Sequence, residues 1–198
     1  MVKRIFDILI SIMCLLLTGW ILAIAYLITL LTLKENPIYT QIRIGRDQKI
    51  FKIFKIKTMH SRENDDNFVT SRDDPRITYF GKLIRKFKID ELPQIFNVLN
   101  GAMSIVGPRP TVIEDAHKMN IEQQKRFSVK PGLTGLAQIN GNTDLSWPKR
   151  IIYDLEYIDN YSLLLDIKIA LKTFLLIILN KVESHPKSGD EWQDLKRL

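Results

Sequence analysis

The sequence predicts an α/β protein that is mostly helical and that is attached to a membrane through its N-terminal segment. Three observations support this fold class: a long uncharged N-terminal run, a pair of segments with alternating apolar and polar residues, and several apolar repeats with helical spacing. The 198 residues carry 29 basic and 22 acidic side chains, a formal net charge of +7. A basic surplus indicates anionic partners such as anionic lipid, phosphorylated small molecules or nucleic acid. The single cysteine, Cys14, excludes an intrachain disulfide framework and fits a reducing, cytosol-facing protein.

Residues 1–35 form the predicted membrane segment. No charged residue occurs between positions 8 and 33, and this run exceeds the roughly 20 residues that a helix needs to cross a bilayer. Because basic residues lie on both sides of the run, the positive-inside rule favours a bent, re-entrant helix with both ends facing the cytoplasm. The run contains no proline, so Thr18-Gly19 is the nearest candidate for the bend. A simple spanning helix is the alternative, whereas a cleaved signal peptide is disfavoured because no small-residue cleavage site follows.

A β-hairpin is predicted next. Residues 38–41 and 50–57 alternate apolar and polar side chains, and Gly45-Arg46-Asp47 lies between the two segments. One face of this hairpin is basic. On that face we expect Lys52 and Lys55 to be solvated.

Three further helices are predicted, over residues 77–88, 111–127 and 163–179. The first and the third carry cations beside a broad apolar face, as helices lying in a membrane interface do. For residues 77–88, a core helix with one solvated face is an equal alternative. Residues 61–74 are polar and predict a loop that closes over a ligand. The predicted domain, residues 36–182, is followed by a solvated tail of residues 183–198.

The stretch between positions 88 and 110 carries the strongest chemical signal. Asp90 and Glu91 precede an apolar repeat that predicts a helix with one buried stripe, made of Leu92, Ile95, Phe96 and Leu99. The helix dipole favours carboxylates at a helix start, so we expect lowered pKa values for the two acids. Capping alone would explain such acids. The rigid Gly107-Pro108-Arg109-Pro110 turn adds a permanent cation suited to phosphate, and this favours a chemical role.

Five motifs occur in order along the chain: DPRIT (74–78), FGKLIRK (80–86), DELPQ (90–94), NVL.G.MS.VGPRP (97–110) and KPGLTGLAQING (130–141). Together they resemble the bacterial sugar transferases, the monotopic phosphoglycosyl transferases that start polysaccharide and glycoconjugate assembly. The match runs from about residue 3 to residue 181, nearly the whole chain. The resemblance implies a re-entrant membrane helix and a catalytic domain at the membrane surface, built from the hairpin and amphipathic interfacial helices.

The resemblance also implies roles for individual residues. Asp90 would be the nucleophile and a ligand of Mg²⁺, and Glu91 would help to hold the metal or manage protons. Lys57, in a Lys-Thr-Met motif, would contact substrate phosphate together with Arg85 and Arg109. A substrate-binding role is further implied for the glycine-rich stretch and for two acidic positions, namely Gln138, Asp154 and Asp166.

The implied reaction moves a sugar phosphate from a UDP-sugar to polyprenyl (undecaprenyl) phosphate and releases UMP, through a covalent phosphosugar intermediate on Asp90. Its place is the bacterial inner membrane, with the catalytic domain facing the cytoplasm and in contact with membrane lipids. A homo-oligomer is compatible with the sequence. Besides the missing proline, two positions depart from the family pattern: Ala102 stands where an aspartate is usual, and Asn142 where an arginine is common.

Two other function classes are alternatives. A catalytically silent membrane-bound scaffold or regulator would keep the fold without turnover, although the intact Asp90-Glu91 pair speaks against it. A membrane-tethered nucleic-acid binder would use the basic surplus. Because aromatic residues are sparsely interleaved with the cations and no nucleic-acid motif is recognisable, nucleic acid is not an expected partner.

Overall fold

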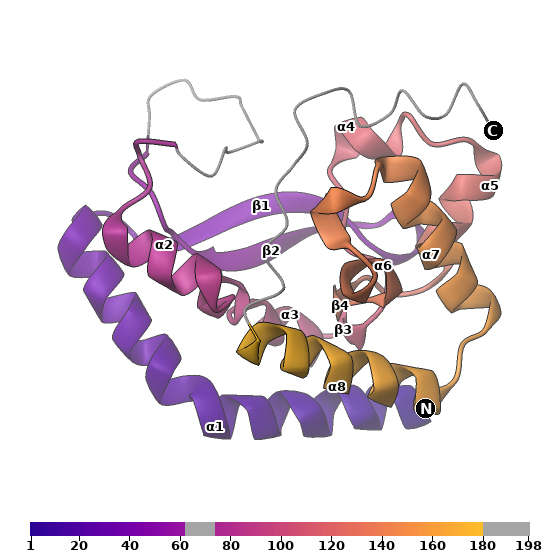
Figure 1. The fold of residues 1–198 in the computed structure, drawn as a ribbon, viewed down its shortest axis with the longest axis horizontal. Helices are drawn as coiled ribbons and strands as arrows, with labels where there is room; N and C mark the ends of the chain where they lie inside the picture. Colours follow the sequence, from indigo (N-terminus) through magenta and orange to yellow (C-terminus); the bar gives the residue numbers. More distant parts are fainter. Residues whose placement is uncertain (62–73, 180–198) are drawn as a thin grey trace.

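A computed structural model describes residues 1–61 and 74–179. These ranges contain a long N-terminal helix, an antiparallel hairpin, a pair of short parallel strands and a set of shorter helices (Figure 1). The predicted fold class, mostly helical with a small hairpin, is confirmed. The predicted tail and, apart from its two end residues, the predicted ligand-closing loop lie outside the described residues.

Helix α1 (Val2–Leu33) continues through the whole uncharged run and bends between its two halves (Figure 1). Near its middle, the Thr18 hydroxyl donates to the Cys14 carbonyl oxygen at 2.8 Å, a back-bond to the preceding turn that often bends helices. Gly19, a weak helix former, follows directly. Among the described residues, α1 is the one helix long and apolar enough to cross a membrane, with a mean hydropathy of 2.6.

The N-terminal half of α1 is fixed to the domain by its charged residues. Lys3 Nζ donates to the carboxylate of Asp166 at 2.6 Å, and Figure 1 accordingly places the N-terminus beside the start of helix α8 (Leu163–Ile178). Arg4 donates to two consecutive backbone carbonyls of the domain. The buried carboxylate of Asp7 accepts a hydrogen bond from a backbone amide at 2.9 Å.

The C-terminal half of α1 packs against the same domain. Ala25 belongs to a buried cluster with Ile56 and Ile84. Just after the helix, Glu35 pairs with Lys57 at 2.9 Å. Both ends of α1 are therefore held by one domain.

The predicted hairpin is confirmed. Strands β1 (Ile38–Ile44) and β2 (Ile50–Ile56) pair antiparallel, with Ile38 opposite Ile56 and Ile44 opposite Ile50. Ile53 of β2 reaches the main core cluster, which contains Val98, Met103, Val106, Tyr157 and Ile169.

Helix α3 (Gln94–Leu99) follows the acidic pair, as predicted, but its buried face differs from the predicted stripe. Phe96 is 48% exposed, whereas Ile95 and Val98 are fully buried. The face is set by Asn97, whose side chain accepts from the Phe54 amide and donates to a β2 carbonyl oxygen at 2.8 Å. This polar attachment to β2 turns Phe96 outward.

The glycine-rich stretch, for which the resemblance implies a substrate-binding role, forms regular structure. Strands β3 (Ser104–Val106) and β4 (Gly132–Thr134) pair in parallel, and helix α6 (Leu136–Ile139) follows. A Cβ at Gly132 would stand 2.1 Å from the Gly107 backbone nitrogen. These glycines therefore allow two backbone segments to touch, which explains their presence without an anion.

The other predicted helices differ in extent. Helix α2 (Tyr79–Lys86) is shorter than its prediction because Thr78 caps its start and Lys88 takes a left-handed conformation with φ 56°. The predicted helix over residues 111–127 is divided, because Asn120 starts a new helix with a capping box. The predicted helix at the end of the domain is confirmed as α8. The remaining elements are η1 (Arg46–Gln48), η2 (Ile89–Glu91), α4 (Ile113–Ala116), α5 (Ile121–Gln124), η3 (Lys125–Ser128), η4 (Asn142–Asp144) and α7 (Trp147–Asp159).

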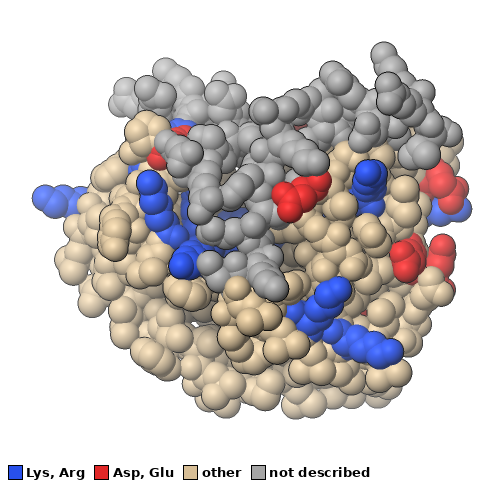
Figure 2. Space-filling view, in the orientation of Figure 1, with Lys and Arg blue, Asp and Glu red and all other residues tan. Residues whose placement is uncertain are grey.

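One side of the molecule is apolar. Large hydrophobic side chains are exposed on α1, α2 and α8, among them Leu16, Leu17, Trp20, Leu83, Leu171, Phe174 and Leu175. In Figure 2 the lower edge of the molecule, where α1 runs in Figure 1, shows neither basic nor acidic side chains. Exposed apolar surface on this scale marks a membrane or protein contact.

Candidate active site

The acidic pair lies in a tight turn between two helices. Lys88 ends α2 in a left-handed conformation, and the 3₁₀ turn η2 then carries Asp90 and Glu91 toward the interior before Pro93 starts α3. Asp90 is 9% exposed. The turn brings both carboxyl groups against β2 and α2, so that cations from those elements surround them.

Glu91 is held by two cations from distant parts of the chain. Arg109 grips it in a fork, with Nη2 at 2.7 Å from Oε1 and Nη1 at 3.4 Å from Oε2. Lys55 Nζ donates to the same Oε1 at 2.8 Å. Burial alone would raise the pKa of Glu91, but the charges of Arg109 and Lys55 hold it well below its usual value. Arg109 and Lys55 therefore favour the ionised form of Glu91.

Asp90 differs from its neighbour. Its buried Oδ1 has no hydrogen-bond partner among the described residues. Burial, and next the charge of Glu91, raise the pKa of Asp90 to about 6, although Lys55, Lys88 and Arg85 act in the opposite direction. The expected lowering at a helix start is thus wrong for Asp90, because η2 offers too short a dipole to offset desolvation. The result is a buried carboxyl group with one oxygen that has no hydrogen-bond partner among the described residues.

Arg85 is placed toward this pair by Thr58. Its Nε donates to the Thr58 hydroxyl at 2.7 Å, and Asp90 and Arg85 influence each other electrostatically. Burial is the main cause that lowers the pKa of Arg85. The predicted neighbourhood of Arg85, Asp90 and Arg109 therefore exists in the structure.

The two lysines at the end of the hairpin are both ion-paired and 20% exposed. Lys55, predicted to be solvated, is 20% exposed and bound to Glu91, so that prediction is wrong. Lys57, predicted to contact phosphate, pairs with Glu35 and also donates to Ser61. Alternation along β2 contained the signal: Lys55 follows buried Ile53 by two residues and shares its face.

The remaining predicted residues contact other parts of the protein. Asp166 accepts from Lys3 and, at 2.7 Å, from the Tyr157 hydroxyl, which joins α1, α7 and α8. Gln138 donates to the Leu133 carbonyl oxygen at 3.1 Å, within its own segment.

Asp154 pairs with Arg126, whose Nη2 lies 2.7 Å from the carboxylate. Both side chains are almost fully buried, and sequence patterning did not indicate Arg126 as a functional residue. Arg43 was missed as well. It donates to the Pro110 carbonyl oxygen at 3.2 Å, and burial followed by the charge of Arg109 lowers its pKa to about 10.

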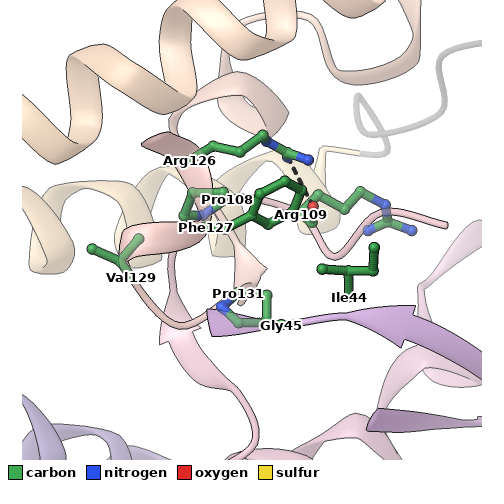
Figure 3. A pocket seen from close by; sticks show the side chains of 8 residues that line it. All are labelled: Ile44, Gly45, Pro108, Arg109, Arg126, Phe127, Val129 and Pro131. Carbon is green, nitrogen blue, oxygen red and sulfur yellow. Dashed lines mark hydrogen bonds between the residues drawn. The ribbon is translucent and has the colours of Figure 1, made fainter. Parts of the chain in front are cut away.

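These arginines surround the loop that carries Arg109. A small pocket behind this loop is lined by residues of β1, the loop itself and the segment before β4, namely Ile44, Gly45, Pro108, Arg109, Arg126, Phe127, Val129 and Pro131 (Figure 3).

Among the described residues, few protein side chains around Asp90 could bind a divalent cation. In the part of the chain that the structure describes, no cluster of three or more acidic, histidine or cysteine side chains could hold a metal. Magnesium, however, is commonly bound by one or two carboxylates and completed by phosphate oxygens and water. The unpaired Oδ1 of Asp90 fits that kind of site, whereas both oxygens of Glu91 are occupied by Lys55 and Arg109.

Comparisons with known proteins show which family the chain is similar to. A chain from Bacillus subtilis, described as the uncharacterized sugar transferase EpsL, is 38% identical over 90% of this chain and 88% of its own length. The UDP-glucose:undecaprenyl-phosphate glucose-1-phosphate transferase of Klebsiella pneumoniae is 42% identical over 90% of this chain, which spans only 40% of that enzyme. The exopolysaccharide production protein ExoY of Sinorhizobium fredii is 35% identical over 90% of this chain and 86% of its own length. Because the family model for bacterial sugar transferases also matches residues 1–180, the chain belongs to the bacterial sugar transferase family.

Proposed function

We propose that this protein transfers a sugar phosphate from a UDP-sugar to undecaprenyl phosphate and releases UMP. The observation that carries the proposal is the buried Asp90 carboxyl with its free oxygen, next to a Glu91 fixed by Arg109 and Lys55. The similar Klebsiella enzyme is named for a reaction of this type with UDP-glucose, and a relative in Salmonella typhimurium, 37% identical, is named an undecaprenyl-phosphate galactose phosphotransferase.

The transfer has two steps. An Asp90 carboxylate oxygen attacks the phosphorus that bears the sugar, a new O–P bond forms, and the bond to the UMP oxygen breaks as UMP leaves with its electron pair. A phosphate oxygen of undecaprenyl phosphate then attacks the same phosphorus. The bond to Asp90 breaks, and the carboxylate is restored.

The residues around Asp90 stabilise the negative charge that develops on phosphate oxygens during this reaction. With a pKa of about 6, Asp90 is mostly ionised at neutral pH yet poorly hydrated, which suits a nucleophile. The guanidinium groups of Arg109 and Arg85 stabilise the charge that develops on phosphate oxygens. Asp90 would also hold Mg²⁺, which when bound supplies positive charge that neutralises the pyrophosphate.

The attachment of α1 supports a location at the membrane surface. Both of its ends are attached to one domain while its exposed middle is apolar, so a re-entrant helix fits better than a helix that crosses the bilayer. The exposed apolar side chains of α2 and α8 extend the membrane-contacting side. We place the domain on the cytoplasmic face of the bacterial inner membrane, where the acceptor phosphate and the soluble donor meet.

Release of UMP from a set of UDP-sugars, with detergent-solubilised protein and undecaprenyl phosphate, tests the proposal. We expect turnover with at least one donor and its loss in Asp90→Asn. Asp159→Asn, which changes an exposed aspartate on α7, serves as the matched control and should turn over like the wild type. A wild-type protein that folds and binds donor but releases no UMP would favour the silent scaffold.

A further inference from the structure

The loop that carries Arg109 has few backbone N–H groups with which to form hydrogen bonds within itself. Pro108 and Pro110 have no N–H group, so neither can donate a backbone hydrogen bond. Carbonyl oxygens of the loop instead accept hydrogen bonds from residues outside the loop. Pro108 O accepts from the Gly132 amide at 2.9 Å, and Pro110 O accepts from Arg43 Nη1 at 3.2 Å.

The carbonyl oxygen of Arg109 itself is bound by Arg126. Nη2 of Arg126 donates to it at 2.9 Å, drawn as the dashed line in Figure 3. The same Nη2 lies 2.7 Å from Asp154 Oδ2, and Nε lies 3.0 Å from it. One guanidinium thus connects the loop that carries Arg109 to helix α7.

Arg126 and Asp154 are too deeply buried to meet a soluble substrate. Their side chains are 2% and 3% exposed. The guanidinium of Arg126 also lies 5.6 Å from the ring centres of both Phe127 and Trp147, which restricts its movement. A buried arginine that is hydrogen-bonded to Asp154 and flanked by two rings is a rigid support for the carbonyl oxygen of Arg109.

We propose that Arg126 and Asp154 are positioning residues, which hold the Arg109 backbone where its guanidinium reaches Glu91. Asp154 orients Arg126, Arg126 fixes the carbonyl of Arg109, and Arg109 Nη2 then stands 2.7 Å from Glu91 Oε1. Misplacing a catalytic group by 1 Å costs on the order of 100-fold in rate. The inference rests on the proposed function, and it replaces the expectation that Asp154 binds substrate.

A double-mutant cycle tests the proposal. UMP release is measured for Arg126→Gln and for Asp154→Asn, first with Arg109 intact and then in the Arg109→Gln background. With Arg109 intact we expect kcat to fall by about 100-fold and KM to change little. In the Arg109→Gln background we expect each variant to lower kcat by less than about threefold, because the group that is positioned has gone. Lys125→Gln, next to Arg126 but on the surface, is the control and should leave kcat unchanged.

Equal losses in the two backgrounds would overturn the proposal, since a purely structural pair acts regardless of Arg109. Asp154→Asn preserves side-chain shape, so it decides the question alone if Arg126→Gln does not fold. The same cycle on melting temperature needs no turnover, and additive shifts there would also count against the proposal. A folded wild type without UMP release contradicts the proposed function, whereas additivity in an active enzyme contradicts only the positioning role.

Discussion

Lys55 offers the sharpest contrast between the sequence pattern and the structure. Lys55 and Lys52 lie three residues apart on β2, and both were predicted to be solvated, yet only Lys55 is bound to Glu91. We therefore expect Lys55→Met to lose stability and activity, and Lys52→Met, which alters an exposed side chain on the same strand, to resemble the wild type.

The expected loss of stability in Lys55→Met can be estimated from the contact between Lys55 and Glu91. The Lys55 Nζ and Glu91 Oε1 atoms are 2.8 Å apart, and the side chains are 20% and 12% exposed, so water screens them weakly. Removing one partner of a fully buried pair costs about 3–5 kcal/mol. Because Arg109 continues to bind Glu91, we expect a smaller loss of about 2 kcal/mol, within the range for a hydrogen bond to a charged group. In a chain of this size, this lowers the melting temperature by about 4–8 °C.

The activity effect is separable from the stability effect. Lys55 orients Glu91, and loss of such a supporting partner typically costs about 10–100-fold in activity. Thermal melting and UMP release are measured for both variants under identical conditions. If Lys55→Met and Lys52→Met had the same melting temperature and the same kcat/KM, the assignment of Lys55 to the active site would be refuted.

Three further results are expected. The kcat/KM for the donor should rise with pH through about 6 and level off above it, because the ionised form of Asp90 attacks; a flat profile between pH 5 and 7 would contradict this. Arg109→Gln should lower kcat by about 100-fold or more, while Arg46→Gln, an exposed arginine, should not; equal activities in the two variants would refute the role of Arg109. Asp7→Ala leaves buried donors without an acceptor, so the free energy of unfolding should fall by about 2 kcal/mol or more in denaturant titrations; an unchanged midpoint would show that the anchor is dispensable.

The sequence correctly predicted the elements that depend on interactions within one segment. The uncharged run, the hairpin alternation and the apolar face of α8 each follow from periodicity within one segment, and the structure confirms them. The neighbourhood of Asp90 and Arg109 was also predictable, because a short helix and a rigid turn separate them in sequence.

Long-range pairing is what the local patterns could not show. Lys55 and Glu91 are 36 positions apart, so alternation along β2 places Lys55 on the face of buried Ile53 but does not show which carboxylate it contacts. A substrate-binding role for Asp154 and Asp166 stays a prediction from resemblance, and the sequence did not indicate their partners in the structure, Arg126 and Lys3. The strands β3 and β4 escaped prediction because three residues are too few to show a period.

The most direct measurement is the mass of the protein after incubation with a UDP-sugar and Mg²⁺ in the absence of undecaprenyl phosphate. We expect a sugar phosphate bound to Asp90, located by peptide mass spectrometry, and its disappearance when undecaprenyl phosphate is added. A preparation that turns over but never carries this mass at Asp90 would contradict the covalent mechanism.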